Sequence, residues 1–116
     1  MTWTTTIYGR SIARTYYLFS KLSYLIGFSY ENLGCWTDNW RSRALYTIDM
    51  KMDPPDIIPK CLRLAWDRGY EVFALQNGQE CYGGANDEYM KYGKSTACNE
   101  KGTGGFLGNQ VYTIVT

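Results

Sequence analysis

The sequence predicts a small, disulfide-stabilised α+β domain in which one helix packs on an antiparallel hairpin. Residues 57–68 carry apolar side chains at helical spacing, with start and stop signals at both ends. Residues 70–83 form two strand-like runs around an Asn-Gly pair, which is a strong hairpin signal. Four cysteines in a chain of 116 residues suit two disulfides in a single domain.

Charge and cysteine placement divide the chain near residue 30. The first 30 residues carry only basic charges, at Arg10, Arg14 and Lys21. All four cysteines follow residue 30. We therefore predict an N-terminal segment at residues 1–30 and a folded domain at residues 31–116.

The N-terminal segment contains an apolar and aromatic run at residues 16–30, which Lys21 interrupts. Three interpretations stay open: a degenerate signal or signal-anchor, a helical arm packed on the domain, and an incorrect gene start. The run spans 15 residues, whereas a membrane-crossing helix needs about 20. Contact with a membrane is therefore expected only through residues 16–30, if at all.

The predicted helix follows a Pro-rich lead-in. Asp56 is placed to cap its N-terminus, and Pro59 falls in the first turn, where no intrahelical donor is missed. Gly69 is placed as the residue that follows the C-terminus. The helix has one apolar face, so Cys61 should point inward with Ile57, Leu64 and Ala65.

The predicted hairpin comes directly after this helix. Residues 70–76 are apolar on both alternating faces, a pattern typical of a central strand. Asn77-Gly78 forms the turn, and residues 79–83 return with Cys81.

The cysteine spacing excludes the common metal and redox motifs. No two of the four cysteines have the C-x-x-C spacing of zinc or thioredoxin-type sites. Spacing alone allows three disulfide connectivities, and four free thiols in a cytosolic protein are the alternative. A helix on the hairpin would place Cys61 beside Cys81. That leaves Cys35 to join Cys98 and tie the first strand to a late loop.

Several short motifs in residues 33–112 resemble, in order and spacing, the WSC (wall-stress-component) domain. Leu33 to Asp38 is similar to the opening of that family, and Arg43-Ala44-Leu45 to its R-x-L. Three further stretches match the family. They are the helix cysteine Cys61 with Arg68 to Ala74, the hairpin Gln76 to Gly83, and the closing Gly104-Gly105 and Val111-Tyr112.

The chain departs from the family by having half the usual number of cysteines. Ala65 and Gly83 stand where the family has a helix cysteine and a hairpin cysteine, and Thr103 stands where a late one precedes Gly-Gly. If one disulfide of the family were lost, both of its cysteines would be replaced, as at Ala65 and Gly83. We therefore expect Ala65 and Gly83 to face each other at near-disulfide distance.

The resemblance implies an α+β fold, a small antiparallel sheet with one packed helix. It also implies an extracellular or cell-surface location and a glycan or polysaccharide partner, as for a lectin-like module without catalysis. The alternative is a secreted or cell-surface domain that binds an extracellular protein, for interaction or defence.

Aromatic residues near the first strand and the hairpin are the candidates for stacking on sugar rings. Trp40 lies in a polar loop, and Tyr82 alternates with Cys81 and is expected to face outward. Trp36, beside a cystine, is expected in the core.

Polar candidates flank the same elements. Asp38 and Arg43 either form an ion pair that fixes their loop or contact ligand hydroxyls. Amides that could bind sugar hydroxyls are Gln76, Asn86 and Asn109, whereas Asn77 is explained by its turn.

Composition argues against other function classes. The chain has no histidine, which excludes histidine-based triads and histidine-ligated metals within it. Its net charge is +1 and its basic residues do not cluster, so nucleic acid is not expected. The Gly-rich loop at residues 102–108 lacks a phosphate-binding motif. No acid pair lies in an apolar stretch, and we predict neither an enzyme nor a cofactor or metal.

Overall fold

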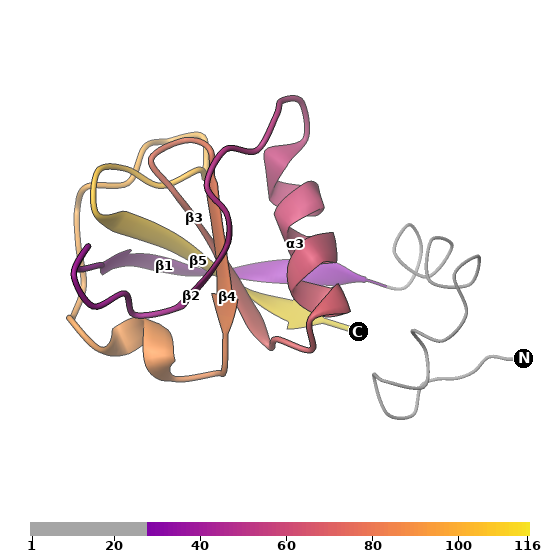
Figure 1. The fold of residues 1–116 in the computed structure, drawn as a ribbon, viewed down its shortest axis with the longest axis horizontal. Coiled ribbons are helices and arrows are strands. Elements are labelled where there is room, and N and C mark those ends of the chain that lie inside the picture. The colour runs from indigo at the N-terminus through magenta and orange to yellow at the C-terminus, as the bar shows by residue number, and fades with distance from the viewer. Residues whose placement is uncertain (1–27) are drawn as a thin grey trace, which may run out of the picture. The chain divides into compact units, whose positions relative to one another are not determined.

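The computed structural model describes residues 28–116, and its compact unit spans Tyr30–Ile114. Residues 1–27 lie outside the described residues, so the division at residue 30 and the nature of the segment stay predictions. None of the helices described is long and apolar enough to cross a membrane. The elements, in chain order, are β1 (Ser29–Thr37), β2 (Tyr46–Asp49), α3 (Ile57–Asp67), β3 (Val72–Gln76), β4 (Glu80–Gly84), the 3₁₀ turn η1 (Glu88–Met90) and β5 (Gly108–Val115) (Figure 1).

The five strands form one sheet in the order β1-β5-β3-β4-β2. The predicted central strand is β3, which is buried along its whole length and pairs antiparallel with β4 and β5. β2 pairs antiparallel with the other side of β4 and forms that edge of the sheet. Within residues 28–116 one α-helix packs on this sheet, and the predicted α+β class is confirmed.

The predicted turn joins β3 to β4. Asn77 and Gly78 both have positive φ values, 55° and 82°. Positive φ at both central residues is the type I′ geometry, whose twist matches that of the flanking strands. Asn77 is thus accounted for by the turn.

The helix has the predicted ends but not the predicted N-cap bond. Asp56 adopts a left-handed conformation, with φ 61°, and its side chain makes no capping hydrogen bond. At the other end Gly69, with φ 81°, lets the chain reverse. The amide of Gly69 donates to the Trp66 carbonyl and that of Tyr70 to the Ala65 carbonyl, at 3.0 and 3.1 Å. This pair of bonds is the Schellman motif.

Both predicted disulfides are present. The Sγ atoms of Cys61 and Cys81 are 2.05 Å apart, and those of Cys35 and Cys98 are 2.07 Å apart. They join residues 20 and 63 positions apart. In the chain-entropy account, loops of these lengths stabilise a fold by about 3 and 4 kcal/mol taken singly. The first bridge ties α3 to β4, and the second ties β1 to the loop before β5.

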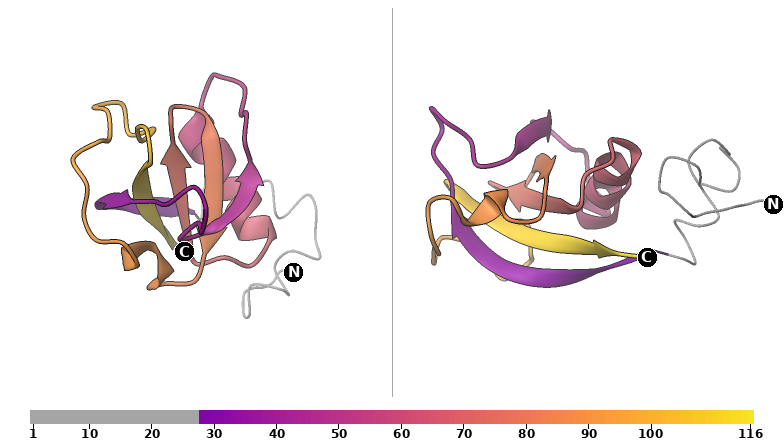
Figure 2. Two further views of the ribbon diagram at one scale, coloured as in Figure 1. Left: turned by 60° about the vertical axis from the view of Figure 1, so that its left-hand side comes forward. Right: turned by 90° about the horizontal axis from the view of Figure 1, so that it is seen from below.

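The two faces of the sheet are covered differently. α3 covers one face, over Phe73, Leu75 and Cys81. Figure 2 shows β1 and β5 as long curved neighbours beside the hairpin. The face opposite the helix carries a core of Leu45, Val72, Ala74, Tyr82 and Val111, with Leu33, Trp36 and Tyr89 packed against it. Side chains from β1, the following loop and η1 therefore cover this second face.

The volume in front of Gly83 is occupied by an aromatic ring. A Cβ atom on Gly83 would lie 2.5 Å from Cδ2 of Tyr70 and 3.0 Å from Cδ1 of Ile48. Tyr70 follows Gly69 at the end of α3, and its ring occupies this space. A side chain on Gly83 would therefore collide with Tyr70, and the expected near-disulfide distance between Ala65 and Gly83 stays a prediction.

Candidate functional site

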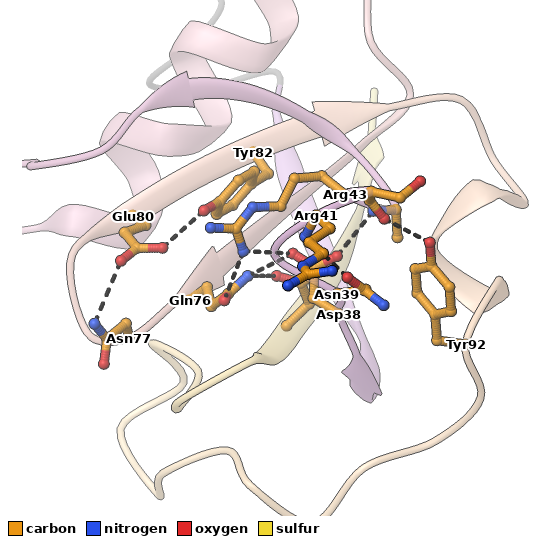
Figure 3. A network of polar contacts seen from close by, with 12 residues as sticks. Asp38, Asn39, Arg41, Arg43, Gln76, Asn77, Glu80, Tyr82 and Tyr92 are labelled. Carbon is orange, nitrogen blue, oxygen red and sulfur yellow. Dashed lines mark hydrogen bonds and ion pairs between the residues drawn. The ribbon is translucent and has the colours of Figure 1, made fainter.

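The loop after β1 is fixed by a buried carboxylate. The side chain of Asp38 is fully buried and accepts three hydrogen bonds. The donors are the Ala44 amide at 2.8 Å, Nε2 of Gln76 at 2.9 Å and Nη1 of Arg43 at 3.0 Å. The interpretation of Asp38 and Arg43 as a loop-fixing ion pair is confirmed (Figure 3). Because its oxygens are buried and bonded, Asp38 positions other groups and does not itself face solvent.

Gln76, at the end of β3, extends this network into the sheet. Its Nε2 also donates to Oδ1 of Asn109 at 2.8 Å, and its Oε1 accepts from Arg43 at 3.1 Å. Asn109 is the register partner of Gln76 on β5. Nδ2 of Asn109 is, among the described residues, the one buried side-chain polar atom without a partner. Both amides are buried, so they hold the loop rather than a ligand at the surface.

Tyr82 lies on the face opposite Cys81, as its alternation predicts, but it does not reach solvent. The residue is fully buried, because Leu45 and the loop after β1 cover that face. Its hydroxyl donates to Oε1 of Glu80 at 2.7 Å. Burial, followed by this hydrogen bond, raises the pKa of Tyr82 well above its usual value. The expectation that its ring faces outward to stack on a sugar is wrong.

Arg43 connects this buried network to the surface. Its side chain is 26% exposed, and its guanidinium lies 5.4 Å from the centre of the Tyr82 ring. Burial by itself would lower the pKa of Arg43, but the hydrogen bond to Asp38 and the nearby acidic groups raise it. Arg43 therefore stays charged, is held by Asp38 and Gln76, and is partly exposed to solvent.

Trp40 and Asn86 lie at two different places. Trp40 is 63% exposed, as predicted for its loop, and the guanidinium of Arg41 lies 5.0 Å from the centre of its ring. Asn86 follows β4 at the end of the hairpin away from Gln76, and its backbone amide donates to Oε1 of Glu71 at 3.1 Å. The two ends of the hairpin are about 13 Å apart, which is the length of the five residues of β3. The structure brings Asp38, Arg43, Gln76 and Tyr82 together, and Asn86 lies apart from them.

A groove runs beside Arg43, on the side toward η1. It has a volume of about 460 Å³ and lies between the segment 43–46 and the residues Asp87, Glu88 and Lys91. Tyr46, at the start of the edge strand β2, is 60% exposed and forms one wall. A smaller hollow of about 210 Å³ shares Tyr46 and Glu88. The Tyr46 ring is stacked on Tyr70, with centroids 5.8 Å apart. We call these two hollows the Tyr46 groove.

The sequence analysis missed Tyr46. The residue follows the R-x-L motif in a short run, and nothing local distinguishes it from a core tyrosine. Its exposure follows from the place of β2 at the edge of the sheet, which depends on the non-local pairing with β4.

Comparison with known families agrees with this fold. A family model described as the WSC domain matches residues 32–105, which is more than half of the chain. The chain belongs to the WSC domain family. A comparison with curated proteins gave no significant match. WSC domains are generally extracellular carbohydrate-binding modules and are typically non-catalytic.

The WSC match covers most of the site. The loop after β1, the hairpin, η1 and the Tyr46 groove all lie within residues 32–105, whereas Asn109 lies outside. This WSC domain holds its four cysteines in two disulfides, and no group of three or more Cys, Asp or Glu within residues 28–116 is arranged to hold a metal ion.

Proposed function

We propose that this WSC domain is a non-catalytic carbohydrate-binding module of an extracellular or cell-surface protein, and that the glycan lies in the Tyr46 groove. The observation that carries the proposal is the exposed Tyr46 ring. It is held against Tyr70 beside a groove lined by charged side chains. A flat aromatic face suits the apolar face of a sugar ring, and charged groups suit its hydroxyls.

Two charged side chains that line the groove, Glu88 and Arg43, are oriented by hydrogen bonds within the protein. Oε1 of Glu88 accepts a hydrogen bond from the Ala85 amide at 3.3 Å, which orients the carboxylate. Arg43 is oriented by Asp38 and Gln76, and it donates from the opposite wall. Acceptors and donors thus face the same hollow, and this arrangement suits the alternating donor and acceptor character of sugar hydroxyls.

The other predicted site residues differ in how directly they would contact the glycan. Asp38, Gln76 and Tyr82 are buried and act by positioning Arg43. Trp40 offers a second exposed ring, outside the groove. Asn86 lies between Ala85 and Asp87, which line the two hollows, and is placed to contact a ligand at the rim.

The extracellular location rests on the family and on the disulfides. Disulfides persist in oxidising compartments, and the cytosol keeps thiols reduced. No cofactor enters the proposal. We also propose that residues 31–116 are the binding domain and that residues 1–30 are a separate segment.

Glycan-array binding by the full chain tests the function. We expect Tyr46→Ala to weaken binding at least 10-fold and Tyr46→Phe to retain most of it, because the ring rather than the hydroxyl makes the stacking face. Phe106→Ala is the matched control, because Phe106 is 77% exposed and does not line the groove.

Two results would overturn the proposal. A wild-type chain that binds no glycan would refute it and favour the protein-interaction alternative. Equal losses in Tyr46→Ala and Phe106→Ala would show that the Tyr46 groove is not the site.

A further inference from the structure

Three cations lie over aromatic rings at the end of the domain where β1 runs into its loop. Arg41 lies over Trp40 with 5.0 Å from Cζ to the ring centre, Lys91 lies over Tyr92 at 5.4 Å from Nζ, and Lys94 lies over Trp36 at 5.7 Å. All three cations are exposed. We call these six residues the basic-aromatic surface.

Hydrogen bonds join the segments that carry these pairs. The Thr37 amide donates to the Gly93 carbonyl at 2.8 Å, and the Ser95 amide donates to the Cys35 carbonyl at 3.0 Å. The hydroxyl of Tyr92 donates to the carbonyl of Ser42. Figure 3 shows Tyr92 beside the loop that carries Arg41 and Arg43. The three pairs therefore belong to one connected surface.

This surface is positive because the two segments that carry its cations hold a single acid, although Lys91 also shares the groove lining with Asp87 and Glu88. Asp38 is the only acidic residue in segments 35–43 and 91–98, and its carboxylate is buried against Arg43 and Gln76. Within the described part of the chain, no ion pair involves Arg41, Lys91 or Lys94. The ring beneath each cation restricts its side chain and leaves its charge intact.

We propose that the basic-aromatic surface binds an acidic polysaccharide, one whose sugar rings carry carboxylate or sulfate groups. This inference rests on the proposed function and names the class of glycan. The cations match the anionic substituents, and the exposed ring of Trp40 offers a stacking face for a sugar.

The surface is continuous with the Tyr46 groove. Lys91 belongs to the surface and also lines the groove, and Arg43 lines the groove from the loop that carries Trp40 and Arg41. A polysaccharide lying in the groove can therefore extend over the cations without leaving the protein. Asp87 and Glu88, on the groove side, would face hydroxyls rather than the anionic groups.

Binding of polygalacturonate, a polymer of uronate sugars, tests this inference with the full chain. Neutral dextran is the comparison polymer. We expect tight binding of polygalacturonate at low salt, weakened by added salt because exposed charges are screened. The double variant Arg41→Gln with Lys94→Gln should bind at least 10-fold more weakly.

The matched control is Lys60→Gln with Arg68→Gln, which removes the same charges from α3 and its C-terminal end, on the other side of the sheet. With both double variants compared at physiological salt, where charges interact over only about 8 Å, the control should change binding less than about 2-fold. Equal losses in the two double variants would overturn the surface as the site.

The remaining outcomes separate this inference from the proposed function. Equal binding of dextran and polygalacturonate by the wild type would overturn the acidic class and leave carbohydrate binding standing. Absence of binding to any glycan would refute both. Binding to vesicles of anionic lipid but not to polygalacturonate, with the same loss in Arg41→Gln with Lys94→Gln, would assign the surface to a membrane.

Discussion

Replacement of Asp38 by alanine tests whether the buried network holds the site loop. Its carboxylate accepts hydrogen bonds from Arg43, Gln76 and the Ala44 amide, and its side chain is fully buried. An alanine at this position cannot accept any of these bonds. We expect the free energy of unfolding to fall and the loop to lose its fixed course.

The magnitude follows from the fate of each donor. Nε2 of Gln76 keeps its bond to Asn109, and Arg43, which is 26% exposed, can turn to water. The amide of buried Ala44 has no such alternative. A buried donor left unsatisfied costs about 1–3 kcal/mol, and the two weakened bonds add to this, so we expect a loss of about 3 kcal/mol.

Urea denaturation of the oxidised full chain, followed by circular dichroism, measures this loss. A change of about 3 kcal/mol lowers the urea midpoint by at least about 1 M for a small domain. Asp67→Ala is the matched control, because Asp67 pairs with Arg63 on the helix surface at 3.3 Å. Exposed pairs of this kind contribute about 0.5 kcal/mol or less.

Asp38→Asn tests whether loss of the carboxylate as an acceptor, rather than loss of side-chain volume, causes the destabilisation. Asp38→Asn keeps the side-chain volume and one acceptor oxygen, but it presents an amide group to the donors of Arg43 and Gln76, so it should also destabilise. The reasoning fails if Asp38→Ala costs no more than Asp67→Ala. It also fails if Asp38→Asn is as stable as the wild type.

Two further predictions concern Gly83 and Tyr112. Gly83→Ala should destabilise the domain by about 1–3 kcal/mol through overpacking, because its Cβ would lie 2.5 Å from Tyr70. In thermal unfolding, addition of Tyr70→Ala to this variant should cost less than the sum of the single changes, and strict additivity would contradict the clash. Burial, then the neighbouring Tyr30, raises the pKa of Tyr112 to about 12. Because the unfolded state loses this proton near pH 10, stability should be full below about pH 10 and decline between about pH 10 and 12. Tyr112→Phe should flatten that decline in unfolding measured from pH 9 to 12, with Tyr82 supplying the remaining slope, and an unchanged slope would count against the assignment.

The parts of the fold that the sequence predicted depend on local chemistry. Helical spacing with Gly69 after it fixes the end of α3, and the Asn77-Gly78 pair fixes a tight hairpin. Once a helix and a hairpin are adjacent in the chain, one cysteine on each suffices to pair them, and the other two follow. These signals need no knowledge of distant residues.

Tertiary structure decided which side chains are available to a ligand. Tyr82 alternates outward from Cys81, yet distant segments that supply Leu45 and Trp36 cover that face and bury it. Tyr46 carries no local mark, yet β2 lies at the edge of the sheet and leaves it exposed. The physical reason is that exposure depends on what the rest of the chain places over a residue, whereas turns and helix ends depend on the residue and its immediate neighbours.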